Sequence, residues 1–368
     1  MISLNPLRIL AVDVGGGTQD VLVYESDREI ENCFKMVLPS QTQIVASRIR
    51  RATAAGRAIH LSGSLMGGGA SGNAIEDHLS AGLAVSSSEE AARTVHNDLE
   101  RVRTLGIEVT SAPPQDAEVI WMRDIDLEAL AVSLSAHEIS VPDIYAIAVQ
   151  DHGYMPGTGG REFRSEFLSS LLENGGNVTN MVYREPPEYM IRMQTVARDV
   201  PGAFIMDTGA AAVLGSLGDA RIAEHVLDRG GILVNIGNLH TFAVAMRGGS
   251  IYGLFEHHTG GVTPAWLHEL VERLKSGSLT QAEVKAHGGH GAAFSPDYAD
   301  AGPFQFVAVT GPNRRIAAPL GYYQAAPHGD MMLTGSYGLV EGVMRTLTKE
   351  GRTLPVSSLA GDSSIPPA

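Results

Sequence analysis

Cysteine is nearly absent from this chain, which removes two kinds of structure at once. Cys33 is the single cysteine among 368 residues, so one chain can form neither an internal disulfide nor a cysteine-ligated metal cluster. Long apolar runs are also missing, because none reaches the roughly 18 residues that a membrane-spanning helix needs. The first fifteen residues read as an apolar strand that runs into glycines, not as a secretory signal. We therefore expect a cytoplasmic protein.

Positive charge is scarce as well. The chain has 27 Lys and Arg against 41 Asp and Glu, a formal net charge of −14. Broad contact with nucleic acid or with an anionic membrane is thereby disfavoured, because both reward clustered basic residues. A small anion can still be bound by backbone N–H groups and a metal ion. Glycine, in contrast, is abundant at 42 residues, and it clusters after apolar stretches, where backbone turns or approaches a ligand closely.

The strongest motif lies near the start of the chain. An apolar segment, Arg8 to Val14, predicts a strand, the next five residues a turn, and Asp20 to Glu25 a second strand. Glycines allow backbone N–H groups to approach phosphate oxygens. A carboxylate at Asp13 would repel phosphates unless a divalent cation lay between them, and Mg²⁺ suits that position. The alternative is a glycine-rich hairpin with an acidic turn. The motif is neither a P-loop nor a dinucleotide fingerprint, since a strand follows the turn.

The same pattern recurs beyond the midpoint of the chain. Ile232 to Asn235 predicts a strand, Gly237 and Asn238 a turn, and Thr241 to Met246 a returning strand. A repeat of this kind predicts two α/β domains of similar plan with a ligand cleft between them.

Four segments in order resemble motifs of the actin-like ATPase superfamily, which contains actin, heat-shock chaperones and sugar kinases. They correspond to the first phosphate motif, the connecting helix, the second phosphate motif and the adenosine motif, and they occupy residues 9–20, 207–212, 234–241 and 307–314. The resemblance implies two actin-like (ribonuclease H-like) domains, each a mixed β-sheet flanked by helices, with a nucleotide cleft between them.

Domain limits follow from this resemblance and from composition. We expect an N-terminal actin-like domain at 1–200 with an inserted segment at about 82–125, and a C-terminal actin-like domain at 201–350. A disordered tail rich in Ser, Pro and Gly is expected at 351–368. Within these limits we predict single helices at 88–105, 186–196 and 336–348.

A narrower resemblance is carried by Met66-Gly67-Gly68-Gly69, Thr310-Gly311-Pro312 and the segment 327–332. These look like a prokaryotic family that bears the provisional label of pyruvate formate-lyase activating enzyme. Such activators generate radicals from S-adenosylmethionine at a cluster held by three closely spaced cysteines. With one cysteine the chain cannot build that cluster, so it is not predicted to be a radical enzyme of this type.

The superfamily resemblance assigns roles to individual residues, with ATP and Mg²⁺ as the implied cofactors. Asp13 would organise the metal ion. The residues expected to hold the nucleotide are Gly15, Gly16, Gly17, Thr18 and Gln19 on one side, Asn235, Gly237, Asn238, His240 and Thr241 on the other, and Gly311 and Arg314 along the nucleoside.

The catalytic base is left open by one departure from the motif. The second phosphate motif normally begins with Asp, and this chain has Asn235, whose amide cannot accept a proton. Asp151 and Asp207 are the alternative candidates alongside Asp13. For Asp151 a turn-capping role is the competing interpretation.

The histidines give a weaker indication of a metal or phosphate site. Adjacent strand residues face opposite sides, so His257 and His258 should not share one ion, and the pair His287 and His290 lacks a regular zinc spacing. Solvated or hydrogen-bonded imidazole is the commoner outcome. His240 is the exception, because inside the second phosphate turn it could donate to a phosphate oxygen.

These residues predict ATP hydrolysis or phosphoryl transfer coupled to domain closure. The alternatives are a small-molecule kinase for a sugar or a carboxylate, a non-catalytic nucleotide sensor or assembly partner, and a metal-dependent transferase that uses the histidines. The expected partners are a nucleotide and an unidentified protein or small-molecule acceptor, with neither nucleic acid nor membrane.

Overall fold

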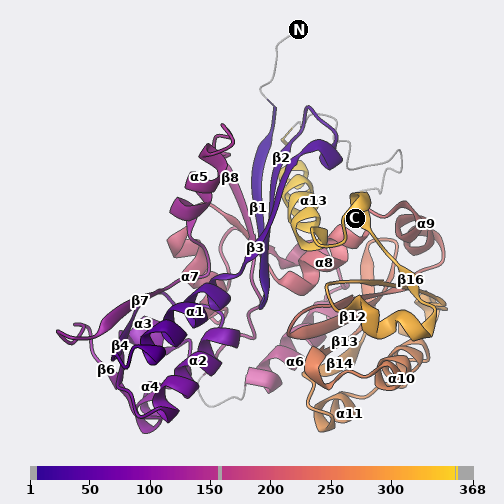
Figure 1. Ribbon diagram of the computed structural model, residues 1–368. Helices are drawn as coiled ribbons and strands as arrows, with labels where there is room; N and C mark the ends of the chain where they lie inside the picture. The colour runs from indigo at the N-terminus through magenta and orange to yellow at the C-terminus, as the bar shows by residue number, and fades with distance from the viewer. Residues whose placement is uncertain (1–5, 156–159, 353, 355–368) are drawn as a thin grey trace.

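Three β-sheets organise the protein in a computed structural model that describes residues 6–155, 160–352 and 354 (Figure 1). The first sheet stands in the upper centre of the view, the third at the lower left and the second at the lower right. Within the described residues, no helix combines the length and the apolar character needed to cross a membrane.

The first sheet has the strand order β3-β2-β1-β8-β10-β9. β1 pairs antiparallel with β2 and parallel with β8, and β8 pairs parallel with β10. Its strands are β1 (Arg8–Val14), β2 (Thr18–Glu25), β3 (Phe34–Pro39), β8 (Ile144–Ala148), β9 (Val182–Tyr183) and β10 (Phe204–Met206). The continuous apolar run in β1 is buried from Ile9 to Val12, as is typical of a central strand covered on both faces.

The second sheet repeats this plan with the order β14-β13-β12-β11-β15-β16. Again a first strand pairs antiparallel with the second and the second with the third, and the first pairs parallel with a strand from later in the chain, here β15. Its strands are β11 (Gly231–Ile236), β12 (His240–Arg247), β13 (Ser250–His258), β14 (Gly291–Phe294), β15 (Phe306–Thr310) and β16 (Tyr323–Gln324). The repeated mixed sheet, flanked by helices in each half, confirms the predicted α/β fold class.

The third sheet is all parallel and has the order β6-β5-β4-β7. Its strands are β4 (Ile59–Gly63), β5 (Val85–Ser87), β6 (Ile107–Val109) and β7 (Glu118–Met122), and its helices are α1 (Gln41–Ala54), α2 (Gly69–Ser80), α3 (Glu89–Ala92) and α4 (Leu99–Thr104). The sheet is inserted between β3 and β8 and runs from residue 59 to 122. The sequence predicts an inserted segment at about 82–125. The domain limits at residues 200 and 350 stay a prediction.

Two helices join the first and second sheets. Helix α8 (Thr208–Ser216) and helix α13 (Thr334–Lys349) lie between the sheets in Figure 1, and one hydrophobic core takes in both helices and residues of both sheets. Helix α13 packs on β1, β2 and β8, although it follows the second sheet in the sequence. The remaining α-helices of the described residues are α5 (Leu127–Ser135), α6 (Gly160–Glu173), α7 (Ile191–Asp199), α9 (Ala220–Asp228), α10 (Pro264–Lys275), α11 (Gln281–Ala286) and α12 (Tyr298–Ala301).

Some local predictions are wrong. The single helix predicted at 88–105 is two short helices, because Ser88 and Asp98 each accept a hydrogen bond from the backbone of a new first turn. The helix predicted at 186–196 begins only at Ile191, since Pro186 and Pro187 cannot continue one. The bounds of strand β13 were not predicted, although His257 and His258 at its end were treated as strand residues. Most of the tail predicted at 351–368 lies outside the described residues.

Candidate functional site

The two glycine turns have the same local structure. In the first sheet the N–H of Gly15 donates to the carbonyl of Thr18 at 2.9 Å, and in the second the N–H of Gly237 donates to the carbonyl of His240 at 2.9 Å. Each bond closes a turn between two antiparallel strands at the same place in the sheet plan. The repeat detected in the sequence therefore extends to the hydrogen bonding of the turns.

The tips of these turns touch one another. A Cβ atom built on Gly16 would lie 2.4 Å from Cδ1 of Leu239, and one built on Gly17 would lie 2.5 Å from Nδ2 of Asn238. A side chain at either position would have to displace the side chain of Leu239 or Asn238 from the opposite turn. Glycine lets the two turns meet without that displacement.

A cavity of about 340 Å³ borders both turns, which is within the size range of small-molecule sites. Ten of the predicted site residues line it: Asp13, Gly15, Gly16, Thr18, Asp151, Asn235, Gly237, Asn238, His240 and Gly311. The loop Met66 to Gly69 and the first residues of α13 complete its wall. Segments from four distant parts of the chain thus meet at one cavity.

Five predicted residues do not line the cavity: Gly17, Gln19, Asp207, Thr241 and Arg314. Gln19 is buried and donates through Nε2 to the carbonyl of Pro39, so its amide serves the β2–β3 edge. The hydroxyl of buried Thr241 bonds to that of Thr259, which in turn donates to the carbonyl of Gly237. Thr241 supports the second turn from behind.

Carboxylates gather where the first turn meets α13. Burial raises the pKa of Asp13 well above its ordinary value, and the charges of Asp20 and Asp207 raise it further. Oδ1 of Asp13 is inaccessible and has no hydrogen-bond partner among the described residues. Burial also raises the pKa of Asp20 to about 7, against a lowering by the hydroxyl of Thr18. Such a group of partly desolvated acids is an environment that a cation stabilises.

Asp207 is committed to a buried ion-pair network. Its side chain accepts the N–H of Gly209 at the start of α8 and lies 2.9 Å from Nη1 of Arg164. The Nε of Arg164 donates to Glu256 at 2.9 Å, and all three charged side chains are 1% exposed. Burial alone would raise the pKa of Glu256, but the charge and hydrogen bonds of Arg164 lower it below its ordinary value. Arg164 on α6 therefore ties α8 to β13.

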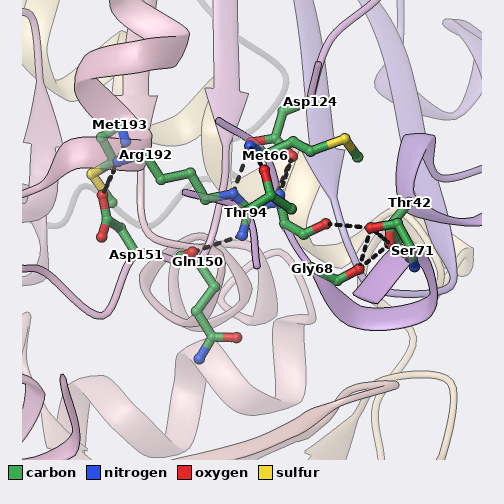
Figure 2. Close-up of polar contacts among 11 residues, drawn as sticks. Thr42, Met66, Gly68, Ser71, Thr94, Asp124, Gln150, Asp151, Arg192 and Met193 are labelled. Atoms are coloured by element: carbon green, nitrogen blue, oxygen red, sulfur yellow. Dashed lines mark hydrogen bonds and ion pairs between the residues drawn. The ribbon is translucent and has the colours of Figure 1, made fainter. Parts of the chain in front are cut away.

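Asp151 has both carboxylate oxygens occupied. Oδ1 accepts the N–H of Gly153 at 2.8 Å. Oδ2 accepts the N–H groups of Arg192 at 2.8 Å and Met193 at 3.0 Å, and these residues are drawn in Figure 2. Burial raises the pKa of Asp151, and these backbone donors oppose the rise. The geometry favours the capping interpretation over the role of a general base, because the carboxylate holds the first turn of α7.

The glycine loop 67–69 is held by an ion pair at the same place. Two nitrogens of Arg192 donate to the two oxygens of Asp124, each at 2.7 Å, and a third donates to the carbonyl of Gln150 at 2.7 Å. Oδ1 of Asp124 also accepts the N–H of Gly67 at 3.1 Å. Figure 2 shows the Arg192 side chain reaching across from α7 to Asp124 beside this loop. A bidentate pair of this kind fixes orientation as well as distance.

The amide of Asn235 is anchored to the neighbouring strand. Its Nδ2 donates to the hydroxyl of Thr310 at 3.1 Å, and Asn313 donates to the carbonyl of Gly237 at 2.9 Å. The second turn and the turn after β15 are therefore one unit. Arg314 begins the 3-10 helix Arg314–Leu320 that follows.

Histidines also contribute to the wall of the cavity. His152 and His240 line the cavity, and their ring centroids are 5.2 Å apart. Burial lowers the pKa of His240 to about 3, so its imidazole is neutral at physiological pH. His257 faces away and contacts Trp266, whereas His258 lies beside His240, in keeping with the alternation along a strand.

The sequence prediction missed several residues of this region: Asp20, Asp124, Arg164, Arg192 and Glu256. One signal in the sequence could have identified Glu256. It lies two residues before His258, and the two side chains would share a face once a strand at 250–258 is recognised. No pattern in the sequence links Arg164 or Asp124 to partners more than 60 residues away.

Comparison with known proteins identifies one family. The profile of a family described as "Putative pyruvate format-lyase activating enzyme (DUF1786)" matches residues 66–316. No curated protein matches the chain.

Solved structures are similar only at low identity. A transcriptional regulator of the ROK family, a homolog of the E. coli MLC protein, has 9% identity, covers 92% of this chain and 78% of its own, and has a TM-score of 0.36. The activator of 2-hydroxyisocaproyl-CoA dehydratase from Clostridium difficile, solved with bound ADPNP, has 8% identity, coverages of 94% and 98%, and a TM-score of 0.31. The ethanolamine utilization protein EutJ from Carboxydothermus hydrogenoformans has 12% identity, coverages of 91% and 90%, and a TM-score of 0.28. Such low scores support no conclusion about ligands or activity.

Proposed function

This chain belongs to the DUF1786 family, and we propose that it is a Mg²⁺-dependent ATP-binding protein that hydrolyses ATP or transfers its terminal phosphoryl group. The observation that supports this most directly is the meeting of the two glycine turns at one cavity with Asp13 in its wall. Backbone N–H groups at such turns are suited to phosphate oxygens.

The residues present fit a magnesium ion and a polyphosphate. Oδ1 of Asp13 is a buried oxygen without a partner in the described parts of the chain, and the charge of Asp20 already opposes its ionisation. A divalent cation bound to these oxygens would neutralise phosphate charge and stabilise the charge that develops during transfer. No basic side chain among the residues lining the cavity is free for that task, because Arg192 is paired with Asp124.

Residues of the two halves would bind different parts of the nucleotide. Gly15, Gly16 and Thr18 hold phosphates from the first half, and Asn235, Gly237 and Asn238 hold them from the second, with Gly311 beside the nucleoside. Since the tips of the turns touch, a phosphate placed directly between them would require Asn238 and Leu239 to move away from Gly16 and Gly17. Binding is then coupled to the relative position of the two halves.

Asp20 is the second carboxylate available to the cation. It lines the cavity, is 7% exposed, and its buried Oδ1 has no hydrogen-bond partner among the described residues. Beside a bound cation it would be ionised and would hold the ion or one of its waters. Asp151 and Asp207 instead orient α7 and α8 through the hydrogen bonds described above.

A non-catalytic nucleotide sensor is the second candidate, and two observations favour it. Asn235 replaces a carboxylate and is tied to Thr310, and both oxygens of Asp151 accept backbone N–H groups. Tight Mg²⁺-dependent binding of ATP without phosphate release would support the sensor.

Radical chemistry of the kind in the family's description does not suit this chain. Cys33 is the single cysteine and is buried, whereas a cluster would need at least three cysteines. Any activation of a partner would have to proceed through nucleotide-driven movement.

Equilibrium binding of a fluorescent ATP analogue, with and without Mg²⁺, tests the proposal. We expect Mg²⁺-dependent binding that Asp13→Asn weakens by at least about tenfold, roughly 1.4 kcal/mol. Gly335→Ala should weaken it too, because a Cβ there would lie 1.9 Å from Oδ2 of Asp13. Gly72→Ala is the matched control, since a Cβ there meets nothing within 4 Å.

Unchanged Mg²⁺-dependent affinity in Asp13→Asn would contradict the assignment. A loss of affinity in Gly72→Ala as large as in Gly335→Ala would show that the glycine effect is unspecific. Phosphate release measured on the same samples separates an ATPase from a sensor.

A further inference from the structure

Three histidines from distant segments converge at the cavity. His152 follows β8 of the first sheet, His240 begins β12, and His290 immediately precedes β14. One ring nitrogen of each lies within 4.8 Å of one nitrogen of both others. Both halves of the molecule therefore contribute to one group of imidazoles.

The rings are tightly packed. The centroids of His152 and His290 are 4.6 Å apart, and that of His240 is 5.2 Å from each. The His258 ring lies beside them, 4.8 Å from His240 and 4.6 Å from His290. The β12–β13 pairing places His240 opposite His258 and so brings their side chains to one face of the sheet.

Hydrogen bonding leaves one ring nitrogen of His152 and one of His240 unpaired within the described residues. Nε2 of His152 and Nε2 of His240 are buried and have no hydrogen-bond partner within residues 6–155, 160–352 and 354, although buried polar atoms are normally paired. The carboxylate of Glu256, whose charge acts on both imidazoles, is already engaged by Gln150 and Arg164. Burial lowers the pKa of both imidazoles, which keeps them in the neutral form that binds metals.

We propose that His152, His240 and His290 bind one divalent transition-metal ion of the zinc type, leaving a coordination position open to the cavity. Three imidazole nitrogens suit Zn²⁺, Fe²⁺, Ni²⁺ or Cu²⁺, whereas Mg²⁺ and Ca²⁺ prefer oxygen. Three protein ligands with a free position are the pattern of a catalytic or substrate-binding metal site.

Small movements are enough to close the site. Zn–N bonds of about 2.0–2.1 Å place tetrahedral ligand atoms roughly 3.3–3.4 Å apart. The three nitrogens, which already lie within 4.8 Å of one another, need to approach by about 1–1.5 Å. Rotation about side-chain bonds supplies displacements of this size.

The open position faces the same cavity as the glycine turns, because His152 and His240 line it. Its ligand would be a water or an oxygen of an acceptor, such as a hydroxyl or carboxylate. His240 then binds the metal ion instead of donating to phosphate. The assignment does not depend on nucleotide binding, so either proposal can fail alone.

The test uses tag-free, full-length protein stripped with a chelator. Zn²⁺ affinity is measured by competition with a chromophoric chelator and stoichiometry by elemental analysis, in millimolar Mg²⁺. We expect one Zn²⁺ per chain, and a loss of affinity of at least about 100-fold in each of His152→Ala, His240→Ala and His290→Ala, since even the loss of outer-shell partners costs 10–100-fold. Co²⁺ should give the visible absorption of a four-coordinate site.

His287→Ala is the matched control. This exposed imidazole is three residues from His290, stacks on Trp266 and lies outside the group, so the variant should bind Zn²⁺ like the wild type. Wild-type affinity no higher than that of the triple alanine variant would overturn the proposal, as would an equal loss in His287→Ala.

A measurement on the wild type alone keeps the proposal testable if the variants fail to fold. Long-range ¹⁵N spectra of the thirteen histidine rings should show three or four rings perturbed by one equivalent of Zn²⁺. No perturbed ring, or a weak change spread over all of them, would overturn the site.

Discussion

At the scale of single residues, the buried guanidinium of Arg164 has the largest consequence for the structure. It lies between Asp207 and Glu256, donates also to the carbonyl of Asp151 at 3.3 Å, and is 1% exposed. Burial would by itself lower the pKa of Arg164, but the two carboxylates raise it. The guanidinium therefore links Asp207 at the start of α8 to Glu256 in β13 of the second sheet.

Replacing Arg164 by Met should destabilise the protein by about 3–5 kcal/mol, because it leaves two buried carboxylates without their cation. Denaturant unfolding measures this as a lower midpoint at unchanged slope. Arg229→Met is the control, since Arg229 pairs with Asp228 at the surface, where both side chains are more than 70% exposed; we expect no measurable change there. Equal midpoints for Arg164→Met and wild type would contradict this account.

At the scale of elements, α8 and α13 cross at two glycines. A Cβ on Gly215 would lie 1.7 Å from the carbonyl oxygen of Thr334, and one on Gly338 would lie 1.8 Å from that of Ala211. Both obstacles are backbone atoms, which cannot move aside as a flexible side chain can. The two helices thus pack with their backbones in contact.

Gly338→Ala should therefore destabilise the protein by about 1–3 kcal/mol, the usual cost of overpacking, even though Ala is the better helix former by about 1 kcal/mol. Gly72→Ala in α2 has open space around the new methyl group and should be neutral or slightly stabilising. Thermal and denaturant unfolding of the two variants checks this. A gain in stability for Gly338→Ala would show that the helices have room to separate.

The third sheet is predicted to be sensitive to acid. His60 and His78 are buried, their Nδ1 atoms bond to the hydroxyls of Ser86 and Thr53, and burial lowers the pKa of each. Below the unfolded value of about 6.5 the unfolded chain binds protons that the folded chain does not. Stability is therefore present at pH 7.5 and falls as the pH drops through 6.5.

Comparing unfolding midpoints at pH 7.5 and 5.5 measures this effect, which is at most about 1.4 kcal/mol per pH unit for each histidine. The double variant His60→Asn, His78→Asn keeps a donor near the Nδ1 position and should lose less stability on acidification than the wild type. An unchanged pH dependence in the double variant would place the acid sensitivity elsewhere.

At the scale of the whole molecule, the cavity depends on three sheets being placed around it. The first and second sheets share one core through α8 and α13, and the insert contributes the loop 66–69. The Asp124–Arg192 pair locks that insert loop to α7 of the first half. Movement of either half would change the cavity directly, which is what the proposed nucleotide-driven closure requires.

Much of this arrangement was predictable from local patterns. The apolar run to Val14, the glycine turn and the returning strand have a period and a length that only a hairpin satisfies, and the same is true of the hairpin after Ile232. The bounds of strand β13 were missed because Gly253 and the charged and histidine residues at 256–258 weaken the apolar alternation. Their burial depends on neighbours β12 and β14, which local sequence does not reveal.

What the sequence by itself determined is the pair of glycine turns, the acid beside the first and the amide beside the second, because turn geometry is a local property of the backbone. Only the tertiary structure decided which side chains share the cavity. Arg164 reaches Glu256 across 92 residues of chain, and His152 meets His240 and His290. Such contacts depend on how sheets pack through α8 and α13, and packing is decided by the whole core at once.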